Sequence, residues 1–252
     1  MAKLIILGSA NAIPDSQHEN THMAVVGQKG TLLIDCPGNP IVRLRQAGLK
    51  FDQITDMILT HFHPDHVTGV PLFLMDLWLM GRQHPLKIHG LDHTLDRIER
   101  SMAFYEWGKW PGFFPVDFNR LPEKEMYLVF KNQEWRVFSS PVRHLIPNIG
   151  LRIEFLGSNK IMAYSCDTEP CSETVRLAHQ ADVLIHESTG TSRGHSTPNQ
   201  AGEIASRAGA KMLYLIHYPT GNPSPPNDWL SEAKTTFSGP VALAKDFMVL
   251  DF

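Results

Sequence analysis

The sequence predicts an α+β fold in which helices cover two packed β-sheets. Short apolar runs of strand length come first, strand-like runs later alternate with helical patterns, and no repeat or low-complexity linker divides the chain. The 252 residues are 42% hydrophobic and 19% charged, which is ordinary for a globular protein with a large core. We therefore expect a single domain over residues 1–252.

The first half of the chain combines apolar runs with helical spacing. A run that ends at Gly8 opens it, and two further runs flank Gln28-Lys29-Gly30 as in a hairpin. Apolar residues at helical spacing then stop at Gly48. We expect strands at 4–7, 23–26, 31–35, 57–60 and 86–89, and helices at 40–49, 72–80 and 91–105.

The second half begins with a segment that resists regular structure. Trp107 to Pro115 carries four large aromatic rings among Pro and Gly, and three interpretations stay open: a buried loop, a substrate-covering lid or a subunit contact. Apolar runs and helical patterns then resume. We expect strands at 127–130, 135–138, 151–155, 160–164, 183–187 and 212–216, and helices at 172–179 and 198–208.

The six residues His61-Phe62-His63-Pro64-Asp65-His66 carry four metal-capable side chains directly after an apolar run. Side chains alternate faces in an extended segment, so His61 and His63 point the same way and can reach one ion. Pro64 ends regular strand pairing, which lets Asp65 and His66 turn toward a second position. This density of ligands predicts a metal site.

Further polar residues follow other strand-like runs, where folds commonly assemble sites. Imidazole and carboxylate ligands without thiolate suit Zn²⁺, with Mn²⁺ or Fe²⁺ as alternatives. We expect two divalent ions: one bound by His61, His63 and His144, a second by Asp65, His66 and His217, with Asp167 bridging both.

The motif from His61 to His66 matches the signature His, any, His, any, Asp, His of the metallo-β-lactamase superfamily. His144, Asp167 and His217 follow in the order that this superfamily uses. The chain thus resembles the superfamily, which implies an αββα sandwich of two mixed β-sheets flanked by helices. The resemblance also implies a two-metal site at the open edge of the sheets.

Within the superfamily the chain is most similar to the ribonuclease Z-like branch. Residues 7–14, 35–38, 184–189 and 194–197 resemble motifs of that branch, although Pro37 and Asn39 depart from its Asp-Cys-Gly-x-Gly turn. By matching position, Glu187 would orient His195, and His195 would supply a proton near the phosphate. Asp65 can accept a proton from the attacking water as well as bind metal.

The resemblance implies a metal-dependent hydrolase, most simply a homodimeric phosphodiesterase with a small-molecule or nucleic-acid substrate. Branch members that process transfer RNA carry a long arm, in many of them inserted between the positions of His144 and Asp167, and only 22 residues separate those two here. Two alternatives stay open. One is a carboxylic-ester, thioester or lactone hydrolase on the same dinuclear site, and the other is a metal-binding protein without catalysis.

Net charge, apolar run length and cysteine content limit the partners and the cellular location that we expect. The net charge of −3 argues against a uniformly basic nucleic-acid coat. The apolar run 4–7 is too short for a secretory signal, and the run 70–80 is too short to span a bilayer. The three cysteines have no zinc-knuckle spacing and indicate reduced thiols. We expect a cytoplasmic protein without membrane contact.

Overall fold

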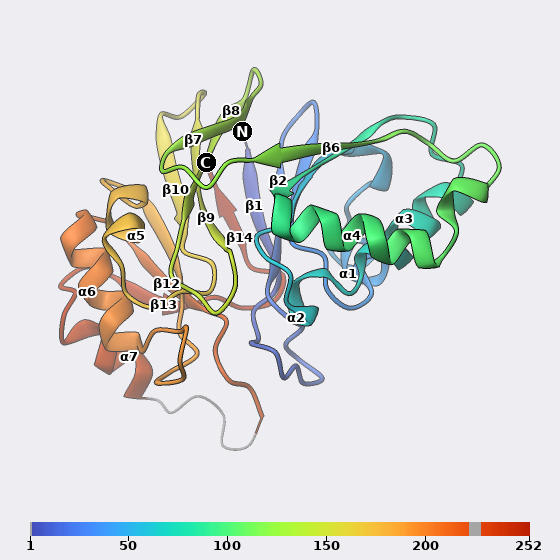
Figure 1. Cartoon of the computed structure of the whole chain (residues 1–252). Coiled ribbons are helices and arrows are strands. Elements are labelled where there is room, and N and C mark those ends of the chain that lie inside the picture. Colours follow the sequence, from blue (N-terminus) through green and yellow to red (C-terminus); the bar gives the residue numbers. More distant parts are fainter. Residues whose placement is uncertain (1, 222–227) are drawn as a thin grey trace.

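The computed structural model describes residues 2–221 and 228–252, and it arranges them in four layers (Figure 1). Three helices cover the outer face of the first sheet: α1 (Pro40–Gln46), α3 (Val70–Leu79) and α4 (Asp92–Phe104). The sheet itself has the strand order β14 (Val249–Asp251), β1 (Lys3–Gly8), β2 (His22–Val26), β3 (Thr31–Ile34), β4 (Ile54–Ile58), β5 (Leu86–Leu91) and β6 (Val116–Leu121).

The second sheet faces the first, and three helices cover its outer side: α5 (Ser172–Leu177), α6 (Pro198–Ala208) and α7 (Asp228–Lys234). Its strand order is β13 (Val241–Leu243), β12 (Leu213–Ile216), β11 (Val183–Glu187), β10 (Lys160–Tyr164), β9 (Ile149–Phe155), β8 (Trp135–Pro141) and β7 (Tyr127–Lys131). Both sheets are mixed, because β3 to β6 and β10 to β13 pair in parallel and the other neighbours antiparallel. The predicted αββα sandwich is confirmed.

Alternation along the strands supplies the two faces that this sandwich needs. Leu4 and Ile6 of β1 join the apolar layer between the sheets, whereas Ile5 and Leu7 join the layer under α1, α3 and α4. On β11, Ile185 faces the inner layer, whereas its neighbour Leu184 faces the layer under α6 and α7. The strands are therefore apolar on both sides, and polar side chains gather at their ends.

Most elements lie where the sequence predicts them, and β11 and α6 have the predicted bounds. The sequence reasoning missed β6, α7, β13 and β14, which carry few apolar residues or are very short. A short helix, α2 (Pro64–Val67), begins inside the His61–His66 motif. The remaining 3₁₀ turns are η1 (Phe51–Gln53) and η2 (Trp107–Lys109).

The aromatic segment from Trp107 to Pro115 forms η2 and then an irregular loop that packs on the outer layer of the first sheet. Phe114 is buried, and Trp110 stacks on Trp78 of α3 with ring centroids 5.1 Å apart. The Trp78 indole N–H also donates to the carbonyl of Pro111 at 3.0 Å. The rings thus pack on the sheet although Phe114 alone among them is fully buried, and the lid and subunit-contact interpretations stay predictions.

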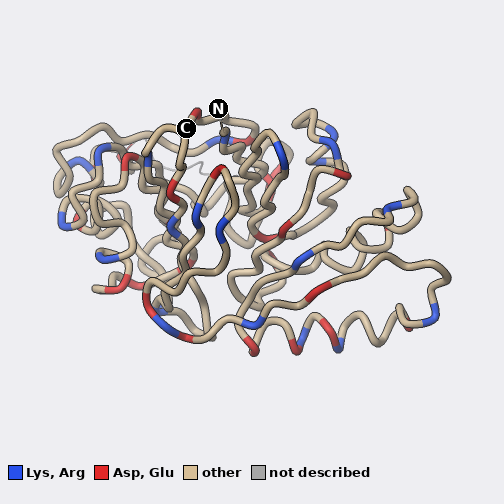
Figure 2. Tube along the Cα trace, turned by 90° about the horizontal axis from the view of Figure 1, so that it is seen from above, with Lys and Arg blue, Asp and Glu red and all other residues tan. Residues whose placement is uncertain are grey.

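Charges are distributed without a basic stripe along the described trace (Figure 2). Basic and acidic residues alternate even within α4, which carries Asp92, Asp96, Arg97, Glu99 and Arg100. Among the described residues, none of the helices combines the length and apolar character that crossing a membrane requires.

Candidate active site

The predicted site residues lie at the ends of strands or in the loops that follow them, and the fold brings these strand ends to one edge of the sandwich. The His61–His66 motif follows β4, and His144 follows β8. Asp167 and His217 follow β10 and β12, and Glu187 is the last residue of β11. In Figure 1 this is the lower edge, beside α2.

Three histidines form one cluster. Nδ1 of His63 lies 3.0 Å from Nε2 of His61 and 3.0 Å from Nε2 of His144. The Nδ1 atoms of His61 and His144 have other partners. Nδ1 of His144 donates to the carbonyl of Gly194 at 2.8 Å, and Nδ1 of His61 lies 3.1 Å from the Thr60 hydroxyl. Their Nε2 atoms therefore present lone pairs to the centre of the cluster, where a cation would fit.

Asp65, His66 and His217 form a second cluster beside the first. Oδ2 of Asp65 lies 3.6 Å from Nε2 of His66 and 3.4 Å from Nε2 of His217. Nδ1 of His66 donates to Asp35 at 2.8 Å, and Nδ1 of His217 contacts the Thr189 hydroxyl at 2.8 Å. Because that hydroxyl donates to the His217 carbonyl, it accepts from the ring, which leaves Nε2 bare.

Asp167 lies between the two clusters. Its Oδ2 atom is 3.5 Å from Nε2 of both His66 and His217, and 3.8 Å and 3.9 Å from Nε2 of His61 and His144. Burial alone would raise the pKa of this carboxyl, but the surrounding histidines hold the pKa well below its usual range. Asp167 is therefore a carboxylate that both clusters can share.

Two buried atoms support the fit of this site to cations. Nε2 of His66 and Oδ1 of Asp167 lack a hydrogen-bond partner among residues 2–221 and 228–252. Buried polar atoms rarely remain unpaired, because the loss of hydration is costly. Burial also lowers the pKa of His61, His63 and His144, which favours the neutral imidazole that binds metal. The donor set of imidazoles and carboxylates thus fits two divalent ions, and the assignment of ligands stays a prediction.

Glu187 and His195 lie next to both clusters. The Glu187 carboxylate is fully buried and accepts the N–H groups of Ser196 at 2.8 Å, Thr189 at 2.8 Å and Thr168 at 3.2 Å. It also holds Nδ1 of His195 at 3.2 Å. Burial would lower the pKa of His195, but Glu187 outweighs it and raises the pKa above its ordinary value.

The His195 ring lies beside one histidine of each cluster. Its centroid is 5.1 Å from that of His144 and 5.8 Å from that of His217. Helix α6 fixes the loop behind it, since Thr197 caps α6 through a reciprocal pair of hydrogen bonds with Gln200. His195 is thus held close to both clusters.

The sequence reasoning missed the residues that orient the predicted ligands. Asp35 had no predicted role beyond the motif 35–38, whereas in the structure it accepts hydrogen bonds from His66 and from the N–H and hydroxyl of Thr60. Thr189 was noted only as part of a motif, and it holds His217. The signal that could have found Asp35 is its position directly after a buried strand.

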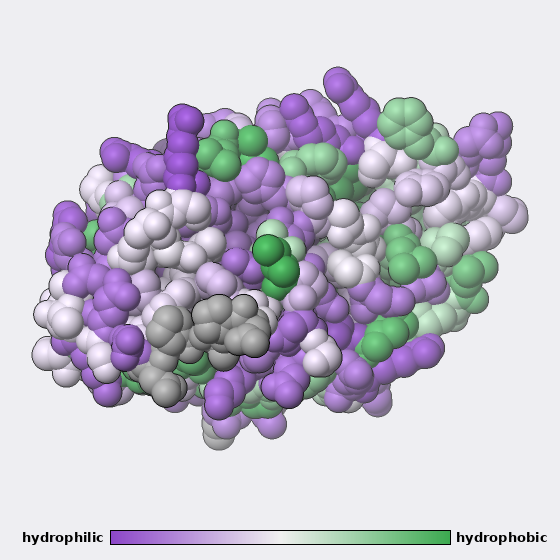
Figure 3. All heavy atoms as spheres, turned by 90° about the horizontal axis from the view of Figure 1, so that it is seen from below, coloured by the Kyte–Doolittle hydropathy of each residue, from purple (hydrophilic) through white to green (hydrophobic). Residues whose placement is uncertain are grey.

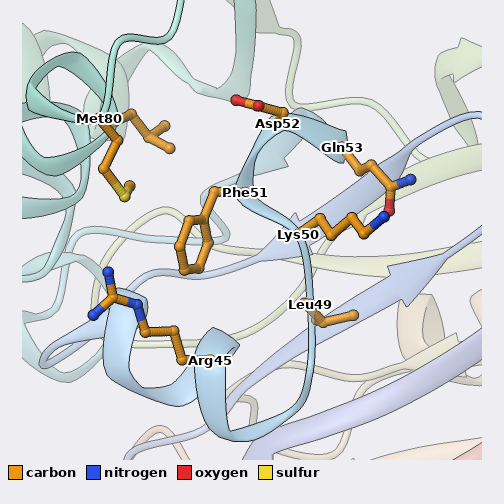
Figure 4. Close-up of a pocket in the computed structure, with 8 residues that line it drawn as sticks. Arg45, Leu49, Lys50, Phe51, Asp52, Gln53 and Met80 are labelled. Atoms are coloured by element: carbon orange, nitrogen blue, oxygen red, sulfur yellow. The ribbon is translucent and has the colours of Figure 1, made fainter.

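Two hollows differ in their relation to the site. One of about 560 Å³ borders it, lined by His144 and Gly194 together with Arg143, Leu145 and Arg193. The other, of about 470 Å³, lies between α1, η1 and α3 on the outer side of the first sheet (Figure 4). None of the predicted site residues lines the second hollow, and its charged side chains, Arg45, Lys50 and Asp52, are exposed.

The four layers and the site at their edge define a protein of the metallo-β-lactamase fold. The structure of YhfI from Bacillus subtilis, described as a metallo-β-lactamase fold protein, matches with a TM-score of 0.83 and 22% identity over 99% of this chain and 98% of that one. The short form of human tRNase Z matches with a TM-score of 0.76 and 24% identity over 99% and 98%. A curated ribonuclease Z from Methanothermobacter thermautotrophicus is 28% identical over 87% of each chain.

More particularly, residues 2–237 match the family described as Anti-Pycsar protein Apyc1, and the chain belongs to that family. The resemblance to the metallo-β-lactamase superfamily and its ribonuclease Z-like branch is confirmed. The sequence reasoning did not predict this particular family.

Proposed function

We propose that the protein is a metal-dependent phosphodiesterase of the ribonuclease Z-like type. The observation that carries this proposal is the buried Glu187 carboxylate bound to His195 beside the two clusters. Curated relatives named ribonuclease Z support the same reaction class. A carboxylic-ester, thioester or lactone hydrolase would not need this pair, so that alternative is not favoured.

The proposed cofactor is a pair of divalent ions, most simply Zn²⁺, with Mn²⁺ or Fe²⁺ as alternatives. His61, His63 and His144 would hold one ion, and Asp65, His66 and His217 the other. Asp167 would bridge the two. When bound, such ions lower the pKa of water and stabilise negative charge on a phosphate.

The chain's own residues would supply proton transfer. The Asp65 side chain belongs to the second cluster and is 12% exposed, so a water molecule could reach it and give it a proton. His195 can give its proton to the leaving oxygen from Nε2, because Glu187 occupies Nδ1. The raised pKa of His195 keeps that proton available near neutral pH.

A direct assay uses zinc- or manganese-loaded protein with bis(p-nitrophenyl) phosphate, a dinucleotide, a cyclic nucleotide and a thioester. We expect metal-dependent release from the phosphodiesters and none from the thioester. Turnover of the thioester alone would contradict the proposal and favour the ester hydrolase.

The substrate is proposed to be a small-molecule or nucleic-acid phosphodiester. Strands β9 and β10 occupy the short span between His144 and Asp167, so a transfer-RNA arm does not fit there. Small phosphodiesters are therefore the first substrates to compare with a precursor transfer RNA.

We further propose a homodimer, with its contact on an apolar patch of α3 and the loop after α4. Leu72, Met75, Tyr105 and Trp110 line one hollow of about 200 Å³, together with Thr68 and Pro71. Leu72 is 37% and Tyr105 59% exposed. Several apolar residues appear among polar ones at the right of Figure 3, and a second copy would cover the apolar side chains named above.

The dimer proposal is tested by light scattering after size exclusion. Tyr105→Glu should convert a wild-type dimer into a monomer that keeps its melting temperature. A wild-type protein that is already monomeric would contradict it.

Two further expectations concern context. The three cysteines are free buried thiols, which supports a reducing, cytoplasmic location. Both sheets share one apolar interior, which supports a single domain over residues 1–252.

A further inference from the structure

His217 has a backbone conformation that residues other than glycine rarely adopt. Its φ is 55°, in the left-handed region, and such strain persists only where neighbours hold it. Its N–H donates to the carbonyl of Ser9 at 2.9 Å, and its own carbonyl accepts the Thr189 hydroxyl at 2.8 Å. The orientation of the His217 ring therefore depends on the position of Ser9.

Residues 9–20 contain turns and isolated bridges, so tertiary contacts must place Ser9. Asp246, in the loop between β13 and β14, makes two of these contacts. Its Oδ1 accepts the Ser9 hydroxyl at 2.7 Å, and its Oδ2 accepts the N–H of Glu19 at 2.9 Å. One carboxylate thus holds both ends of this segment.

Arg43 of α1 completes the arrangement. Its Nη2 atom donates to Oδ2 of Asp246, and its Nε donates to the carbonyl of Leu7 at 2.9 Å. The guanidinium also lies 4.1 Å from the centroid of the Phe247 ring. The Asp246 and Arg43 side chains are only 5% and 15% exposed, so each charge depends on the other.

We propose that Asp246 is a positioning residue that aims His217 at the second metal position through Ser9. The inference rests on the proposed function only in requiring ions at the two clusters. It predicts an asymmetric effect, because the first cluster is oriented from elsewhere, by Thr60 and Gly194.

Asp246→Asn tests the proposal through metal binding, independently of hydrolysis. The amide keeps the shape of the side chain but turns an NH₂ group toward donors that a carboxylate oxygen accepted. We expect Zn²⁺ titration against a chromophoric chelator to show two sites in the wild type. In the variant, one affinity should fall by about 10- to 100-fold, as for other residues that orient a ligand, and the other should stay unchanged.

A matched control separates positioning from general stability. Asp182 is also a partly enclosed carboxylate, which accepts the Ile161 N–H at 2.8 Å and Lys211 Nζ at 2.8 Å, at the end of β11 away from the site. Asp182→Asn should lower the melting temperature and leave both affinities for Zn²⁺ intact. Ser9→Ala should weaken the same single affinity as Asp246→Asn, but less, because Asp246 still accepts the Glu19 N–H and the Arg43 guanidinium in that variant.

The outcomes that overturn the inference are distinct from those that overturn the proposed function. The positioning role is refuted if Asp246→Asn keeps both wild-type affinities for Zn²⁺. It is also refuted if both affinities fall together and the melting temperature falls with them. If the wild type also hydrolyses phosphodiesters in that case, the proposed function stands alone. A wild type that binds fewer than two ions overturns both.

Discussion

Replacing His195 by alanine tests the proposed proton donor most directly. Glu187 holds Nδ1 at 3.2 Å, so Nε2 is the nitrogen that can protonate a leaving oxygen. General acid catalysis is typically worth about 10²- to 10⁴-fold, or about 3–5 kcal/mol of transition-state stabilisation. We expect His195→Ala to lower kcat by this factor on a dinucleotide, whose alkoxide leaving group needs a proton.

The assay compares this substrate with bis(p-nitrophenyl) phosphate at matched metal loading. Nitrophenolate is stable without a proton, so we expect a loss of less than about tenfold on that substrate. His84→Ala, an exposed histidine before β5, is the control and should leave both rates unchanged. An equal loss on both substrates, or unchanged turnover of the dinucleotide, would refute the assignment.

Three further predictions concern other groups. Because Glu187 raises the pKa of His195, Glu187→Gln should shift the alkaline limb of the kcat profile to lower pH; an unmoved limb would contradict this. Thr189→Val removes the acceptor for Nδ1 of His217 and should weaken Zn²⁺ binding by about 10- to 100-fold, measured by competition with a chelator. Unchanged Zn²⁺ affinity would show that another contact fixes the His217 tautomer. Burial lowers the pKa of His22 to about 4, so His22 stays unprotonated in the folded protein at a pH where the unfolded chain, below about pH 6.5, binds the proton. The free energy of unfolding should therefore fall by about 2 kcal/mol from pH 7 to pH 5 through this residue. His22→Gln should remove that part of the slope in urea titrations, and an identical slope would exclude His22 as its source.

Elements with a dense apolar pattern could be predicted closely. Residues 183–187 and 198–208 have the predicted bounds, because each carries apolar residues at the period of its structure. Strand β6 was missed because Val116–Leu121 carries few apolar residues and lies at a sheet edge where most of its side chains are exposed or half-buried. Tertiary pairing with β5, rather than local propensity, makes it a strand.

The side chains that converge at the site could also be anticipated, because histidines and carboxylates follow buried strands. Their orientation could not. The tautomers of His66 and His217 depend on Asp35 and Thr189, which lie 31 and 28 residues away along the chain. Such partners become neighbours only after the sheets form, so no local pattern marks them.

The backbone at the site explains why this edge resists prediction from local pattern. Asp35, Cys166 and His217 all have left-handed φ values, of 61°, 53° and 55°, and each lies just beyond the end of a strand. A non-glycine residue in this region costs about 1–3 kcal/mol, so three together are a substantial local strain. The turn at each point re-aims the chain as it leaves the strand, and carboxylate or imidazole groups there reach the clusters. Sequence rules assign left-handed turns to glycine, which has no side chain. At this site the left-handed residues keep their side chains.

If the backbone strain serves to place these side chains, His217→Gly should relieve the strain and raise the melting temperature of the metal-free protein while removing one predicted ligand. A lower melting temperature would instead show that the imidazole contacts outweigh the strain.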